Sequence, residues 1–412
     1  MSTSASKLSG PWSNWIMAVA YVGLVFSFQS SYGILSRAMG RALQLSVADI
    51  SLIGSVYTWC FAATQIMAGP LLDRVGVQRI LPAACTIFVL GIFCFGFASG
   101  LHGLLVAQAL LAVGASFGFI GAGFVGGLWF KPERYGAMFS WVQFTASIIA
   151  CVAQAVAVLL IDRYPWNWIV NAIGMSGLGL MVLLLLFMAD PPTVQMRGWP
   201  RHPLEFSKCV MQDLAGALRK TGMPAVIAAG AVSFGVMLSI GVVWGPQLGT
   251  SLGFSDHGSA LAATSWLGLA LGAPAFAWLS DKQLSLPKAM LLGYLAQLIL
   301  LAWMTLSPAE NLYGFTLQMF AFGLASGSSM LPFTMAARLA GARYAGTSAA
   351  LVNGAQFVAG GLLMSLPGRL LGSAQGAMEV RHVLMVLPAA MLLLLPCFLS
   401  ICKQPSMRGA HA

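Results

Sequence analysis

The sequence predicts an all-α membrane protein in which twelve transmembrane helices form two parallel six-helix repeats. Three observations predict this fold: the hydrophobic content, twelve apolar runs of spanning length, and landmarks that recur at one offset. Of the 412 residues, 58% are hydrophobic and 8% are charged, and the mean hydropathy is +0.84. No soluble fold could bury so much apolar surface, so lipid must be the main solvent.

Twelve runs are long and apolar enough to cross a bilayer, which takes about 20 residues per helix. They are 14–36, 49–71, 80–99, 103–128, 137–161, 168–189, 223–247, 257–280, 288–306, 311–338, 343–367 and 380–402. The runs are too long and too continuously apolar for barrel strands, so we expect helices. The glycine-rich fourth run has the least sharp ends.

Three landmarks of the first half return in the second half. Leu45-Ser46 pairs with Phe254-Ser255, Asp73 with Asp281, and Arg134-Tyr135 with Arg343-Tyr344, at offsets of 209, 208 and 209 residues. With an even number of helices per half, both halves enter from the same side, as parallel repeats. The predicted organisation is a bundle over 1–189, a linker over 190–222 and a bundle over 223–412.

The linker ends in the sequence PLEFSKCVMQDLAGALRK. Leu204, Val210, Leu214 and Leu218 recur there at helical intervals, which predicts an amphipathic helix on the cytoplasmic surface of the membrane. A plain tether is the alternative.

The positive charges indicate the topology. If the N-terminus is cytoplasmic, sixteen of the 21 Lys and Arg fall on the cytoplasmic side and five on the other. This asymmetry predicts a multi-pass inner-membrane protein with both termini in the cytoplasm. It also explains the net charge of +10 without a nucleic-acid partner. The first dozen residues are short and polar, so we expect the first run to be a true helix and not a cleaved signal peptide.

The stretch GPLLDRVGVQR, residues 69–79, begins at the end of the second run. Its residues Gly69, Leu71, Asp73, Arg74 and Gly76 match the pattern G-x-L-x-D-R-x-G. This pattern resembles the loop signature of the major facilitator superfamily, which lies between the second and third of twelve helices. The family usually adds basic residues directly after the second glycine, whereas here only Arg79 supplies a charge. A weaker copy in the second half keeps Asp281 and Lys282 but lacks both glycines.

The resemblance implies a gate. In this family the loop aspartate faces the N-terminus of a helix in the opposite half, where unpaired N–H groups and the helix dipole favour an anion. Asp73 would therefore contact the eleventh helix near Gly346 and Thr347, with Arg74 and Arg79 holding Asp73 in place. Asp281 would similarly contact the fifth helix near Gly136. Breaking these contacts would let the halves rock around a site between them.

The predicted spans carry no carboxylate or histidine near their middle. All eleven acidic residues lie at span ends or in loops; Asp49, for example, is three residues after the predicted helix cap Ser46. His102, His257 and His382 lie at outer span ends, which leaves no obvious proton carrier, although Arg37 or Arg41 could reach an outward vestibule. The fifth run lacks the glycine-proline signature of drug-efflux members. Gln108 stands where many proton-coupled members carry arginine.

Polar uncharged residues are the remaining candidates for contact with a substrate. They are Gln29, Tyr32, Tyr57, Gln143, Trp244, Gln247, Asn353 and Gln356, with Thr58, Gln65, Ser147 and Gln154 on the same helices. Buried amides need partners or water. For any single residue, a hydrogen bond between helices is the alternative. Together they predict a small polar solute, neutral or zwitterionic.

We therefore predict a transporter that moves a small polar organic solute by alternating access. The alternatives are an efflux carrier for a hydrophobic compound and a transporter-like sensor that never turns over. The sequence has no nucleotide loop, no metal-ligand spacing and no nucleophile–base pair, so we expect neither an enzyme nor a cofactor nor a metal site. We expect a monomer whose partners are a small-molecule solute and the lipid bilayer. Direction, coupling ion and substrate stay open.

Overall fold

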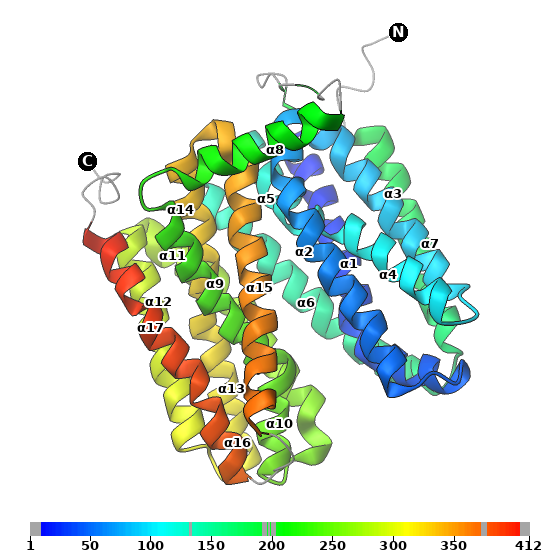
Figure 1. Cartoon of the computed structure of the whole chain (residues 1–412), viewed down its shortest axis with the longest axis vertical. Helices are drawn as coiled ribbons and strands as arrows, with labels where there is room; N and C mark the ends of the chain where they lie inside the picture. The colour runs from blue at the N-terminus through cyan, green and yellow to red at the C-terminus, as the bar shows by residue number, and fades with distance from the viewer. Residues whose placement is uncertain are drawn as a thin grey trace. The chain divides into compact units, whose positions relative to one another are not determined.

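The computed structural model describes residues 10–131, 134–191, 196, 198, 203–371 and 377–403. Every regular element within these ranges is helical (Figure 1). The α-helices are α1 (Pro11–Ala42), α2 (Val47–Val75), α3 (Val77–Gly96), α4 (Leu101–Ala115), α5 (Gly118–Trp129), α6 (Tyr135–Ile161), α7 (Trp166–Phe187), α8 (Pro203–Leu218), α9 (Met223–Ser239), α10 (Gly245–Ser251), α11 (Gly258–Lys282), α12 (Leu286–Leu306), α13 (Leu312–Ser326), α14 (Leu331–Ala340), α15 (Ala345–Leu371), α16 (Ala377–Leu384) and α17 (Val386–Lys403).

Each of the twelve predicted runs is helical, which confirms the all-α fold class. Eight runs form one continuous helix each, and four are interrupted: α4–α5, α9–α10, α13–α14 and α16–α17. Among the described residues, eleven helical segments are long and apolar enough to span a membrane. The remaining run, α2, is 29 residues long and carries Asp49, Asp73 and Arg74 near its ends.

The fourth helix of each half is interrupted at equivalent places. The break between α4 and α5 falls at Ser116 and Phe117, and a 3₁₀ turn over Gly327–Met330 separates α13 from α14. These positions are about 211 residues apart, close to the offsets of 208 and 209 residues between the sequence landmarks. The interruption is therefore a property of the repeat.

The chain divides into two compact units. Unit 1 comprises Met1–Met138, Ile148–Ala217 and Ala342–Ala350, and unit 2 comprises Phe139–Ser147, Leu218–Gly341 and Leu351–Ala412. Unit 2 thus includes a short piece of α6, the fifth spanning helix of the first half. Unit 1 includes the first turns of α15, the fifth spanning helix of the second half. The predicted bundle boundaries stay predictions.

Aromatic side chains join α1, α3 and α7 in unit 1. Phe28 makes edge-to-face contacts with Phe88 and Phe95, at centroid distances of 6.2 and 5.4 Å, and Phe95 contacts Trp166 at 5.9 Å. The hydroxyl of Tyr21 donates a 2.8 Å hydrogen bond to the Gly114 carbonyl. Such aromatic pairs add about 1 kcal/mol each beyond area burial.

Unit 2 is held by a satisfied polar network. The Gln297 amide donates to the Ser233 carbonyl and the Ser326 hydroxyl at 2.8 and 2.9 Å, and accepts from the Ser233 hydroxyl at 2.7 Å. Gln297 is fully buried. These bonds link α9, α12 and α13, as polar side chains do between membrane helices.

Two local predictions can be compared with the structure. The Ser46–Asp49 capping box at the start of α2 is confirmed, with both reciprocal hydrogen bonds present. Helix α8 forms where the amphipathic helix was predicted, and Val210 and Leu214 are buried. Leu218 is 41% exposed, and Asp213 is buried on the same helix. The Leu204 side chain lies outside the described residues.

Candidate functional site: the α2–α3 turn and the start of α15

A single residue separates α2 from α3. Gly76 adopts φ +86°, a left-handed conformation that side chains with a Cβ rarely tolerate. A Cβ at this position would also collide with the Asp190 carboxylate. The second glycine of the motif is therefore required by both backbone conformation and space.

Asp190 caps the first turn of α3. Its Oδ1 accepts hydrogen bonds from the Val77 and Gln78 N–H groups at 2.7 and 3.3 Å. Burial raises the pKa of the Asp190 carboxyl, while the two N–H groups and the Arg79 charge act in the opposite direction. Arg79 is exposed, and its charge favours the ionised form of Asp190. The role predicted for Arg79 beside Asp73 stays a prediction.

The raised pKa of Asp190 predicts a pH-dependent stability. Since burial disfavours the carboxylate in the folded state, its contribution to stability is greatest at low pH and falls as the pH rises through the raised pKa. An asparagine side chain in its place would keep an acceptor oxygen without the charge. We expect Asp190→Asn to gain thermal stability relative to the wild type between about pH 4 and about pH 7, as measured by differential scanning fluorimetry. A constant difference across this range would contradict the assignment.

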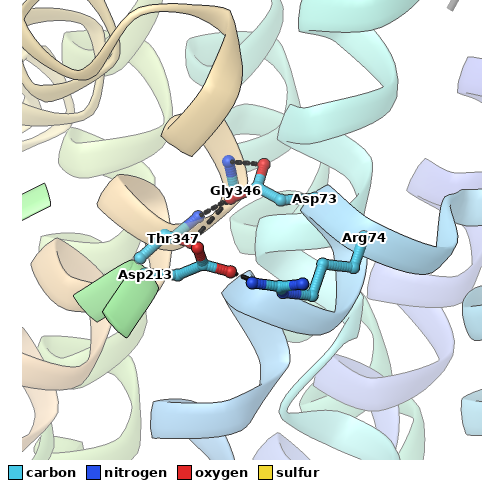
Figure 2. Close-up of polar contacts among 5 residues, drawn as sticks. All are labelled: Asp73, Arg74, Asp213, Gly346 and Thr347. Atoms are coloured by element: carbon cyan, nitrogen blue, oxygen red, sulfur yellow. Dashed lines mark hydrogen bonds and ion pairs between the residues drawn. The ribbon is translucent and has the colours of Figure 1, made fainter. Parts of the chain in front are cut away.

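Asp73 caps the N-terminus of α15 (Figure 2). Its Oδ1 accepts from the Gly346 N–H at 2.8 Å, and its Oδ2 accepts from the Thr347 N–H at 2.8 Å and the Thr347 hydroxyl at 2.6 Å. Asp73 is 8% exposed. The carboxylate satisfies N–H groups that have no partner within the helix and faces the positive end of its dipole. The contact predicted for Asp73 is present, and we name it the Asp73–α15 contact.

The first motif glycine permits this contact by bringing two backbones together. A Cβ on Gly69 would lie 2.6 Å from the Ala350 Cβ and 2.7 Å from the Thr347 Cα, and would also collide with the Gly346 carbonyl. A Cβ on Gly346 would in turn lie 2.9 Å from the Gly69 carbonyl oxygen and 3.0 Å from Asp73 Oδ1. The two glycines face each other where α2 meets α15.

Arg74 binds the linker helix. Its Nε donates to Asp213 Oδ2 at 2.6 Å, and the side chains are 15% and 2% exposed (Figure 2). The Arg74 carbonyl accepts a 2.8 Å hydrogen bond from the Gly198 N–H. The prediction that Arg74 positions Asp73 is thus replaced by an ion pair with α8, because the arginine points to the linker side of the turn.

We expect the Arg74–Asp213 pair to show strong coupling. Asp213→Leu or Arg74→Leu alone leaves a buried charge without its partner, which costs about 3 kcal/mol. The double variant removes both charges and should recover a large part of that loss. Thermal unfolding of the four proteins gives the coupling free energy, and strictly additive losses would argue against the pair.

The second-half copy of the motif differs in shape. Asp281 and Lys282 end α11, and three residues, Gln283–Ser285, separate it from α12. Ala277, in the place of the first glycine, is buried. Asp281 lies in unit 2 and Gly136 in unit 1, so the second contact stays a prediction.

The predicted substrate-contacting residues divide into satisfied and unsatisfied groups. Gln143 donates to the Ser147 hydroxyl at 2.9 Å, Gln356 to the Ser329 carbonyl at 3.0 Å, and the Trp244 indole to the Met364 carbonyl at 2.9 Å. The buried hydroxyls of Tyr32 and Tyr57 have no hydrogen-bond partner within the part of the chain that the structure describes. Asn353 is buried, and Gln29 and Gln247 are half-buried.

Sequence reasoning missed Asp190 and Asp213 as members of the site. Asp213 shares the α8 face of Val210, Leu214 and Ala217, which are all buried. An acid among apolar residues at helical spacing was the available signal. Asp190 follows α7 directly and carried no comparable pattern.

The chain is similar to several known proteins. Residues 17–364 match the family described as "Major Facilitator Superfamily". A multidrug resistance protein MdtL of Vibrio parahaemolyticus is 27% identical over 143 residues, 35% of this chain and 36% of that protein. A putative multidrug resistance protein MdtD of Shigella boydii is 26% identical over 237 residues, 55% of this chain and 48% of that protein. The chain thus spans less than half the length of these curated relatives.

The fold also matches a solved structure. A bacterial homologue of the iron transporter ferroportin, in an outward-facing state, aligns with a TM-score of 0.71 at 16% identity, covering 95% of this chain and 99% of the other. At this identity the likeness shows the fold alone. Since the family match covers most of the sequence, the chain belongs to the major facilitator superfamily, and the eleven described helical segments of spanning length fit a multi-pass membrane protein.

Proposed function

We propose that this transporter exports an uncharged, largely hydrophobic compound from the cell across the inner membrane. The observation that carries the proposal is where the charges lie. In the described spans, every Asp, Glu, Lys and Arg falls within four residues of a span end. The buried acids of the described residues, Asp73 and Asp213, are both bonded at the α2–α3 turn. A charged substrate would find no counter-charge in the membrane interior.

The relatives named for multidrug resistance support export of a hydrophobic compound. The small polar solute predicted from the sequence has less support, because several of its expected contacts are used between or within helices. Helix α6 lacks the glycine-proline signature of drug-efflux members, so this chain differs from their usual sequence pattern. We keep the polar solute as the second candidate, since unpartnered polar groups persist in unit 1.

The Asp73–α15 contact would act as the gate of alternating access. It joins the turn of the first-half motif to a helix of the second half, and it depends on a carboxylate and two facing glycines. Forming the contact stabilises one conformation, and breaking it permits the other. We place this end in the cytoplasm from the distribution of Lys and Arg.

Counterflow in proteoliposomes tests the proposal. Purified protein is supplied with labelled chloramphenicol, tetraphenylphosphonium, amino acids, monocarboxylates or sugars. We expect exchange of chloramphenicol, an uncharged compound, and lower accumulation of it in cells that express the protein. Exchange restricted to amino acids or sugars would favour the second candidate. A protein that binds but never exchanges any compound would be a sensor.

A further inference from the structure

We propose that substrate recognition through hydrogen bonds resides in unit 1, at Tyr32, Tyr57, Gln65 and Gln108, and selects an uncharged ligand that both donates and accepts hydrogen bonds. We name these residues the unit 1 polar set. The inference rests on the proposed function and specifies the site and the ligand chemistry.

Each member of the set has a buried polar atom with no hydrogen-bond partner among the described residues, although the two tyrosines as a whole are half-buried. Gln65 is 1% exposed, and neither atom of its amide is bonded. Gln108 is 2% exposed, and its Oε1 has no partner. The buried hydroxyls of Tyr32 and Tyr57 are also unbonded. Such groups are rare in folded proteins because each carries an uncompensated desolvation cost. Four such side chains lie on three helices of one bundle. We infer that a ligand or water molecules bind to them in the functioning transporter.

Three members lie at a similar depth. Tyr32 is ten residues before the end of α1, Tyr57 ten residues after the start of α2, and Gln108 seven residues after the start of α4. These helix ends lie on the same side of the bundle, so a rise of about 1.5 Å per residue places all three about 10–15 Å from it. Tyr32 lies beside Gln108, without the geometry of a hydrogen bond, and α2 packs along α4. Gln65 is eight residues further along α2 than Tyr57 and extends the set inward.

The rings of the two tyrosines pack against neighbouring aromatic side chains. This packing fixes the position of each hydroxyl oxygen. Tyr57 stacks on Phe61 with ring centroids 6.0 Å apart, and Tyr32 contacts Phe95 edge-on at 6.1 Å. A phenol and a primary amide each offer both a donor and an acceptor. None of the four side chains carries a charge at neutral pH, so the complementary ligand is uncharged.

Unit 2 provides the contrast. Three of its buried amides are bonded to protein: Gln297 to Ser233 and Ser326, Gln318 to Ala309 and Ser307, and Gln356 to Ser329. The unpartnered buried polar atoms of its described residues are the hydroxyls of Ser140, Ser329 and Thr334. Amides that are hydrogen-bonded within the protein stabilise the bundle and have fewer free donors and acceptors for a ligand. Recognition of the ligand through hydrogen bonds is therefore assigned to unit 1.

The test separates affinity from stability in the purified full-length protein. Gln65→Leu, Gln108→Leu and Tyr57→Phe each remove an unpartnered group, and Gln297→Leu is the matched control on a bonded amide. We expect each unit 1 variant to weaken chloramphenicol binding about tenfold, the effect of one hydrogen bond, with an unchanged or higher melting temperature. Gln297→Leu should lower the melting temperature and keep the affinity within about twofold. Tetraphenylphosphonium, a cation without hydrogen-bonding groups, should bind weakly and equally to all variants.

Two results would overturn the inference. Unit 1 variants that keep full chloramphenicol affinity would refute the site, as would a loss of melting temperature in Gln65→Leu equal to that in Gln297→Leu. A wild-type protein that binds only tetraphenylphosphonium, or neither probe, would refute the ligand class. Counterflow keeps the two proposals apart: exchange of another compound preserves transport while the inference fails, and variant-sensitive binding without exchange preserves the inference alone.

Discussion

Asp73→Asn will leave the protein folded and inserted but lower its transport rate at least about tenfold. The substitution removes the charge that faces the α15 dipole and replaces one acceptor oxygen with an NH₂ group, which cannot accept from the N–H opposite it. Charge-assisted hydrogen bonds contribute about 1.5–3 kcal/mol each. A loss of about 2–3 kcal/mol in one conformation reduces its population about 30- to 150-fold.

Transport in proteoliposomes and the melting temperature are measured together. Asp49→Asn is the matched control, because Asp49 is also an acid near an end of α2 that hydrogen-bonds to backbone, yet its partner Ser46 belongs to the same helix start. We expect that control to retain the transport rate. Full-rate transport by folded Asp73→Asn would show that the contact has no gating role.

Gly69→Ala will abolish transport, although one methyl group is the only change. The new Cβ would lie within 2.7 Å of the Ala350 Cβ and the Thr347 Cα, so α2 and α15 must separate. Separation by even about 1 Å breaks the short hydrogen bonds of Asp73. Measured transport should fall below that of Asp73→Asn, because all three hydrogen bonds are lost together.

The control for Gly69→Ala lies on the same helix. Gly54 has nothing within 4 Å of the position that a Cβ would take. Gly54→Ala should therefore keep the transport rate and gain up to about 1 kcal/mol from helix propensity. Equal transport by the two alanine variants would contradict the close approach of α2 and α15.

The sequence was sufficient for the fold and for the main contact of the site. Uninterrupted apolar runs predict helices directly because lipid requires internally satisfied backbone. The contact of Asp73 with Gly346 and Thr347 followed from the family resemblance. The role of Arg74 did not, because it follows Asp73 directly in sequence yet pairs with Asp213 of α8. The role of Arg79 stays a prediction.

The polar residues show a second limit of sequence reasoning. Gln65 and Gln297 are both amides in apolar runs, and nothing in the local sequence distinguishes them. Gln297 meets two serines from other helices, and Gln65 meets none. Whether an amide is bonded depends on residues far away along the chain, so only the structure separates the groups that support the fold from those free to bind a ligand.

The central claim is that the Asp73–α15 contact opens and closes during transport. Its most direct test is the distance between spin labels at Gln78→Cys and Ala342→Cys, two exposed positions next to the contact, in a variant whose seven native cysteines are replaced. We predict a short distance at rest and a second, longer one during turnover, with Asp73→Asn shifting the population to the longer. A single distance that neither turnover nor Asp73→Asn changes would contradict the account.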